Sequence, residues 1–272
     1  MLNVTLLGGT SFSLDDTVIK SDLGPSGRLL ACYLFEFMGR VHRRERLADL
    51  FWSELEPEKG RSALNTALWR IRKMLGAAVD GGSDRLVTIG DDVLLEPASF
   101  IKVDTHGLQS ACRLTADRKG RSELTEADEE VIGAAVVNYG GPFLDGDDGD
   151  WILQERERLH CLFVTSTLEL MRLAARRGHY ERALDYGRLV LSADPLRESV
   201  QRDLMLLLVL NGQRANAIHT YRRLKSILKS DLCIEPMPDT KRLYEDIISG
   251  EIFEHLDSLT STYFASRSHD SR

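Results

Sequence analysis

The chain has 272 residues, of which 43% are hydrophobic and 28% charged, and it is long enough for two domains of about 100–150 residues each. No apolar run approaches the roughly 20 residues of a membrane span, and the N-terminus lacks the basic start and long apolar core of a signal peptide, so we expect a cytoplasmic protein without a membrane partner. The net charge is −7, but residues 39–76 hold nine Lys/Arg against five Asp/Glu, a local positive excess that could meet phosphate.

The N-terminal segment predicts a small antiparallel sheet followed by a helix. Its first 23 residues alternate between apolar and polar positions, with Gly-Gly and Asp-Asp turns between short runs. Pro25 then stands at a helix start, and apolar residues follow at helical spacing up to Phe37. Gly39 is expected to end this helix.

The next segment predicts two more helices and a β-hairpin. We expect helices over residues 42–52 and 60–76, separated by a polar linker. Strands over residues 85–89 and 93–96, joined by Gly-Asp-Asp, form a plausible hairpin. This order is the outline of a winged helix-turn-helix, in which the last helix enters the major groove of DNA.

The helix at residues 60–76 has an unusual polar side. Its apolar stripe consists of Leu64, Leu68, Ile71 and Leu75, whereas no acid occurs between residues 61 and 73. Amides and guanidinium groups bind purine edges, and cations neutralise phosphate. The alternative is an ordinary surface helix with Trp69 tucked under a neighbour. We favour DNA recognition, because the preceding helix is also basic; the candidate residues are Arg43, Arg44, Arg61, Ser62, Asn65, Thr66, Trp69, Arg70, Lys73 and Arg85.

The remainder of the chain predicts helices. Residues 105–150 should form a polar bridge. The acidic run at 145–150 is interpreted as a solvated helix-capping loop rather than a calcium site, because the bidentate Glu of a calcium loop is missing. The pattern at residues 178–183 recurs 34 residues later, which is the tetratricopeptide period. The predicted fold is thus mainly α with small β: a winged helix-turn-helix domain (1–104), an all-α tetratricopeptide-like repeat domain (105–250) and a flexible tail (251–272).

Several motifs resemble one known family. Four segments resemble the DNA-binding half of the Streptomyces antibiotic regulatory protein family: residues 27–34, 44–48, 50–52 and 61–76. Further segments resemble its bacterial transcriptional activation domain: residues 139–144, Trp151 with 155–159, 194–198, 217–224 and 234–239. The resemblance covers roughly residues 3–250. It implies a transcription activator that binds direct-repeat sites near a promoter and contacts RNA polymerase. The expected partners are thus double-stranded promoter DNA and RNA polymerase, with either a homodimer or paired protomers on the DNA repeats. The acidic hairpin tip departs from this pattern, so Arg85 at the wing's base is the better phosphate candidate.

Two rival functions are weighed against this interpretation. An enzyme is disfavoured, because no motif of nucleophilic, zinc-dependent or phosphate-loop chemistry occurs; we expect no cofactor, and the four widely spaced cysteines predict reduced thiols rather than a metal site. The second rival is a protein-interaction adaptor whose winged domain serves packing or dimerisation. The repeats could also take a peptide or small-ligand effector near Arg176, Arg177 and Arg182, although solvated charge is the favoured interpretation of these three.

Overall fold

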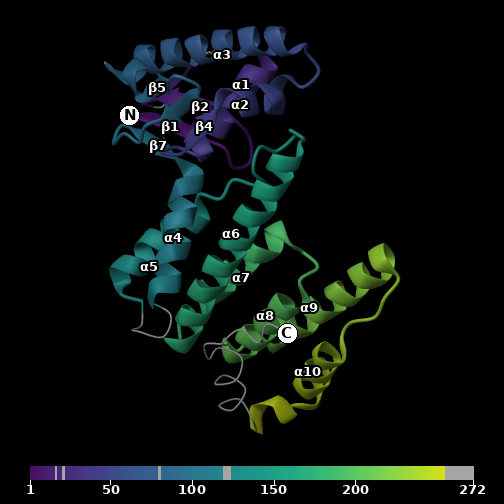
Figure 1. The fold of residues 1–272 in the computed structure, drawn as a ribbon. Coiled ribbons are helices and arrows are strands. Elements are labelled where there is room, and N and C mark those ends of the chain that lie inside the picture. The colour runs from purple at the N-terminus through teal and green to yellow at the C-terminus, as the bar shows by residue number, and fades with distance from the viewer. Residues whose placement is uncertain (16, 20–21, 79–80, 119–123, 255–272) are drawn as a thin grey trace. The chain divides into compact units, whose positions relative to one another are not determined.

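The computed structural model describes residues 1–15, 17–19, 22–78, 81–118 and 124–254 (Figure 1). The chain divides into two compact units. The N-terminal unit consists of Met1–Ser110 and Val137–His160, and the C-terminal unit of Ala111–Val136 and Cys161–Arg272. The domain boundary expected between residues 104 and 105 stays a prediction. Of the expected tail, the structure describes a 3-10 turn, Glu251–Glu254, and residues 255–272 lie outside the described part.

The described part of the N-terminal unit holds two small sheets, three complete α-helices, a 3-10 turn (Gly82–Arg85) and the first turns of two longer helices that continue into the C-terminal unit. The first sheet has the strand order β3-β2-β1-β7 and the second the order β4-β6-β5. The strands are β1 (Leu2–Thr5), β2 (Ser11–Leu14), β3 (Thr17–Val18), β4 (Val41–Arg43), β5 (Leu86–Ile89), β6 (Asp92–Leu95) and β7 (Ile101–Val103). The helices are α1 (Gly24–Glu36), α2 (Arg44–Trp52) and α3 (Pro57–Ala78). The winged helix-turn-helix outline and the mainly helical fold are confirmed.

The predicted helix over residues 42–52 is wrong at its start. His42 and Arg43 belong to strand β4, which pairs antiparallel with β6, so that His42 lies opposite Val93. The helix begins only at Arg44, whose N–H donates to the Asp91 carbonyl at 2.9 Å. The predicted hairpin is confirmed, because β5 pairs antiparallel with β6, and β4 adds a third strand to it.

The later segment 137–160 completes the N-terminal unit. Phe143 forms a β-bridge with Leu7, and both side chains are buried. Gly8 has a φ of +77°, and a Cβ there would lie 2.3 Å from the Gly140 carbonyl oxygen. Only a glycine permits this close approach of the two backbones, so the turn after β1 is shaped to receive the later segment.

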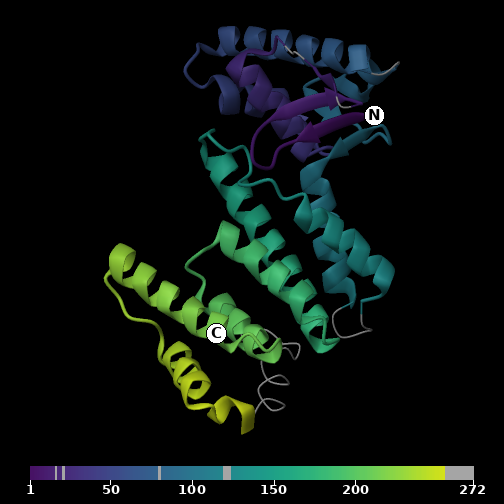
Figure 2. The same cartoon turned by 180° about the vertical axis from the view of Figure 1, so that it is seen from behind.

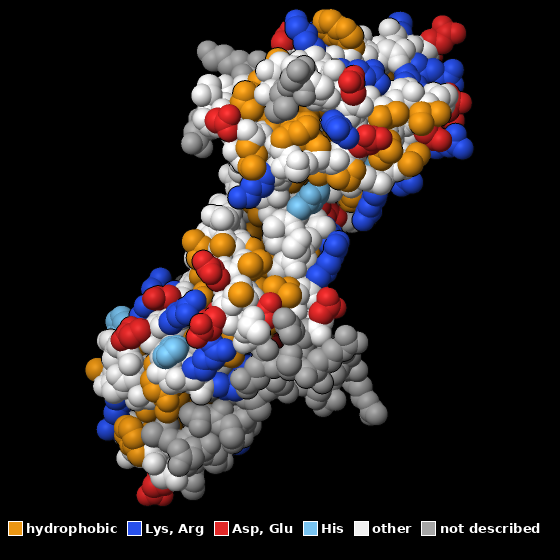
Figure 3. Space-filling model, turned by 90° about the vertical axis from the view of Figure 1, so that its left-hand side faces the viewer, with side chains coloured by type: hydrophobic (Ala, Val, Ile, Leu, Met, Phe, Trp, Pro, Cys, Tyr) orange, Lys and Arg blue, Asp and Glu red, His pale blue; other side chains and the backbone are white. Residues whose placement is uncertain are grey.

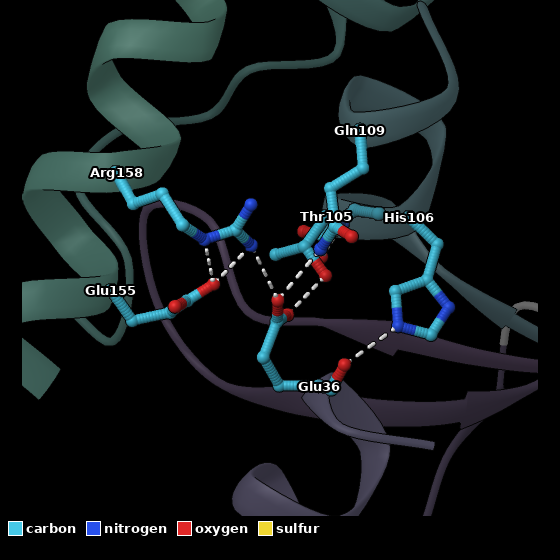
Figure 4. A network of polar contacts seen from close by, with 7 residues as sticks. Glu36, Thr105, His106, Gln109, Glu155 and Arg158 are labelled. Atoms are coloured by element: carbon cyan, nitrogen blue, oxygen red, sulfur yellow. Dashed lines mark hydrogen bonds and ion pairs between the residues drawn. The ribbon is translucent and has the colours of Figure 1, made fainter. Parts of the chain in front are cut away.

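A buried carboxyl group joins three helices of the N-terminal unit. Glu36, at the end of α1, is only 4% exposed. It accepts hydrogen bonds from Thr105 and from Gln109 (2.7 Å) of α4 (Asp104–Arg118), and Arg158 of α6 (Asp150–Arg176) lies 3.2 Å away (Figure 4). Burial and the neighbouring Glu155 carboxyl raise the pKa of Glu36 to about 8.

The acidic loop before α6 has a partner that the sequence did not reveal. Asp147 accepts a hydrogen bond from the Arg28 guanidinium of α1 at 2.9 Å, and its side chain is only 18% exposed. The loop thus anchors α1 in addition to leading into the helix that begins at Asp150.

The C-terminal unit consists of helical hairpins (Figures 1 and 2). Besides parts of α4 and α6, its helices are α5 (Glu126–Val137), α7 (Tyr180–Ala193), α8 (Glu198–Leu210), α9 (Arg214–Ile227), a π-helical turn (Leu228–Leu232) and α10 (Pro238–Ser249). Gly178 and Gly212 follow the ends of α6 and α8 with φ near +70°, and Ala183 and Ala217 are fully buried, as the repeat predicted. No helix in the described part of the chain has the length and apolar character needed to cross a membrane.

Candidate nucleic-acid interface

Helix α3 presents a polar arc to solvent along most of its length. Leu64, Leu68, Ile71 and Leu75 are at most 1% exposed, which confirms the predicted phase of the helix. Ser62, Asn65, Thr66 and Lys73 are exposed on the other side. Within the described part of the N-terminal unit, Figures 1 and 2 show α3 along one edge, and Figure 3 shows Lys and Arg side chains along the outer margin of the same unit.

Trp69 belongs to this arc rather than to the core. It is 59% exposed, so the alternative of a tryptophan tucked under a neighbour is wrong. The Lys73 ammonium lies 5.5 Å from the centre of its ring, where a cation is attracted by the π face. Both side chains line a hollow of about 330 Å³, together with Asp22 and Leu23 and with Arg70 and Met74 of α3.

On its other flank the arc is tied to α2 and to the wing. The Arg44 guanidinium donates to the side-chain oxygen of Asn65, so these two candidate residues touch. Arg72 donates to the Leu86 carbonyl at 3.0 Å and to the Thr88 hydroxyl, which fixes α3 against β5. Arg72 was not among the candidate residues.

The electrostatics on this flank favour an anion. Burial lowers the pKa of Arg72, and the positive charge of Arg44 lowers it further. A phosphate that approaches both guanidinium groups would reduce their mutual repulsion and form charge-assisted hydrogen bonds with them. The sequence signal that could have identified Arg72 is the Arg-x-Arg-Lys pattern at residues 70–73.

Three further candidates form exposed or half-exposed ion pairs with acids. Arg43 lies 3.3 Å from Asp92, which neutralises part of the acidic wing tip, and Arg61 lies 3.9 Å from Glu45. Exposed pairs of this kind contribute at most about 1 kcal/mol, so phosphate can replace the acid. Arg85 lies 3.4 Å from Glu96 at the opposite end of β5 from the tip.

A winged helix-turn-helix whose third helix has an exposed face, combined with helical hairpins, is the architecture of a class of bacterial regulatory proteins. The comparisons with known proteins agree. The chain belongs to the bacterial transcriptional activator domain family, whose model matches residues 103–248. The resemblance to the Streptomyces antibiotic regulatory proteins is thereby confirmed.

The relatives carry regulatory names. Regulatory protein AfsR of Streptomyces griseus is 25% identical over 256 residues, which are 92% of this chain and 25% of AfsR. The chain therefore spans about a quarter of that relative. Transcriptional regulatory protein MoaR1 of Mycobacterium tuberculosis is 25% identical over 266 residues, covering 91% of this chain and 82% of MoaR1. The solved structure of Mycobacterium tuberculosis EmbR in complex with a low-affinity phosphopeptide has the same fold, with a TM-score of 0.66 and 21% identity over 96% of this chain and 69% of EmbR.

Proposed function

We propose that this chain is a sequence-specific DNA-binding transcription activator. The observation that carries the proposal is the exposed arc of α3, which offers amide, hydroxyl, indole and cationic groups and contains no acid between residues 61 and 73. A surface that only had to remain hydrated would mix both signs of charge. Membership in a transcriptional activator family and the regulatory names of the relatives support the same conclusion.

In the proposed complex, α3 enters the major groove. Asn65, Thr66 and Arg70 contact base edges, and Ser62 and Trp69 border them. Arg44 holds the Asn65 oxygen, which leaves the amide N–H groups of Asn65 for an acceptor on a base. The phosphate contacts come from Arg43, Arg44, Arg61, Lys73 and Arg85, to which we add Arg72.

Activation requires a contact with RNA polymerase. We infer that the exposed loop between α2 and α3, with Leu55 44% exposed, supplies part of this contact and that the helical hairpins supply the remainder. Two protomers on adjacent promoter repeats would strengthen binding through effective concentration. The helical hairpins also offer a place for a peptide or small-ligand effector, since such stacks expose extended surfaces.

A DNA-binding measurement on the full chain tests the proposal. We expect retardation of the DNA upstream of its own coding sequence, with an affinity that falls steeply with salt. Lys73→Ala should reduce the slope of log K against log salt by about one unit, because one phosphate contact is lost. The matched control is Lys229→Ala, an exposed lysine of the C-terminal unit, which should leave the slope unchanged.

Two results would contradict the proposal. Absence of salt-dependent DNA binding would favour the adaptor function, in which the winged unit only packs or dimerises. DNA binding without stimulation of a purified polymerase on the bound promoter would limit the protein to repression or to DNA architecture.

A further inference from the structure

The C-terminal unit contains a groove formed by three consecutive helices. Helix α8 packs against both α7 and α9 and lies between them (Figures 1 and 2). Leu204 and Leu208 of α8 line the base of a hollow of about 450 Å³. Arg188 of α7 and Arg223 of α9 stand on its walls, with His219 and Asn216 beside them.

The charge of this groove is opposite to that of the chain around it. Residues 105–272 hold 27 Asp/Glu against 22 Lys/Arg, but no acid occurs among the described residues that line the groove. Arg223 is exposed and has no hydrogen-bond or ion-pair partner among the described residues, and Arg188 pairs only with the exposed Asp185 at 2.9 Å. The groove therefore combines an apolar base with two guanidinium groups: that of Arg223, which has no partner among the described residues, and that of Arg188, which is held only by an exposed acid.

The arginines first considered for an effector site differ in this respect. Arg177 and Arg182 lie 2.7 and 2.9 Å from the carboxylate of Glu129, which is 5% exposed. They neutralise a buried charge within the unit, and removing them would leave that charge unpaired. An acidic ligand would have to compete with Glu129 for Arg177 and Arg182, whereas no described acid competes for Arg223.

We propose that this groove binds an acidic peptide segment of another protein. Carboxylates of the segment pair with Arg188 and Arg223, and its leucine-like side chains cover Leu204 and Leu208. A volume of about 450 Å³ accommodates a few side chains of a segment that continues beyond the groove. Charge complementarity favours an acidic segment, and the walls of exposed long side chains favour a peptide over an enclosed small molecule.

The test uses the full chain and a labelled peptide pair in fluorescence anisotropy. The probe is a twelve-residue peptide of alternating Glu and Leu pairs, and its matched control has Gln in place of every Glu. We expect the Glu peptide to bind at least about tenfold more tightly than the Gln peptide at low salt, and to lose this advantage as salt screens the pairs.

Two arginines that are neighbours in sequence provide the matched variants. Arg223→Glu should weaken binding of the Glu peptide about tenfold or more, because an attraction becomes a repulsion. Arg222→Glu changes the net charge equally, on an exposed position of α9 that does not line the groove, and should have little effect. Both variants should retain wild-type affinity for DNA, which separates this proposal from the proposed function of α3.

Three outcomes would overturn the proposal. Equal binding of the Glu and Gln peptides would leave an apolar groove without charge selection. Equal losses in the two arginine variants would mean that net charge, rather than the groove, attracts the peptide. A loss of DNA affinity in Arg223→Glu that matches the loss of peptide affinity would assign this arginine to DNA.

Discussion

Glu36→Gln should remove a pH dependence from the stability of the N-terminal unit. The pKa of Glu36 is raised from 4.5 to about 8 by burial and by the Glu155 carboxyl, so the folded state holds a proton that the unfolded state has released. The protonated Glu36 carboxyl therefore stabilises the folded state fully below pH 4.5, and this stabilisation is lost as pH rises toward 8. Each pH unit between the two values corresponds to about 1.4 kcal/mol, which amounts to about 3 kcal/mol at pH 7. The side-chain amide of the variant stays neutral and can donate to Glu155 as the protonated acid does.

Urea unfolding of the full chain from pH 5 to pH 8 measures this effect. The wild-type free energy of unfolding should fall relative to that of Glu36→Gln across the range. Glu54→Gln, which alters an exposed carboxylate of the same unit, controls for net charge and should run parallel to the wild type. Parallel curves for wild type and Glu36→Gln would refute the reasoning, as would a wild type that gains stability relative to the variant with rising pH.

Three further predictions concern α3 and the boundary of the N-terminal unit. Asn65→Ala should cost about 1–3 kcal/mol on the preferred DNA site and little on random DNA; equal losses in competition binding would exclude base reading. Leu68→Ala, at a position 1% exposed, should cost about 2–5 kcal/mol of unfolding free energy by denaturant titration, and an unchanged midpoint would contradict its place in the core. A fragment of residues 1–104 lacks Thr105, Gln109 and Arg158, so its amide protons should exchange faster than the same amides in the full chain; equal exchange would show that Glu36 needs no partners.

The features that sequence patterns predicted are those whose information is local. The stripe of Leu64, Leu68 and Ile71 recurs at helical spacing, so it fixed both the existence and the phase of α3. The glycines at 178 and 212 marked two helix ends because each has a positive φ. The same helical spacing predicted which side chains of α3 face solvent, although their role in DNA binding stays a proposal.

The features that were missed depend on partners distant in the chain. His42 and Arg43 were assigned to a helix because they precede an amphipathic segment, but pairing with β6 decides their conformation. Strand β7 pairs in parallel with β1 across almost 100 residues, and no local pattern indicates such pairing. Glu36 carried a weak signal, an acid within the apolar run Leu34-Phe-Glu-Phe-Met38.

The closure of the N-terminal unit by residues 137–160 has a consequence for synthesis. At about 5–20 residues per second, the ribosome needs several seconds to make the chain between residue 110 and residue 160. During that interval α3 exists, but the nascent unit lacks Phe143 for Leu7, Asp147 for Arg28 and Arg158 for Glu36. The segment that completes the N-terminal unit is thus made only after α5, so a nascent chain that ends before residue 137 carries α3 in a unit whose fold is not yet complete.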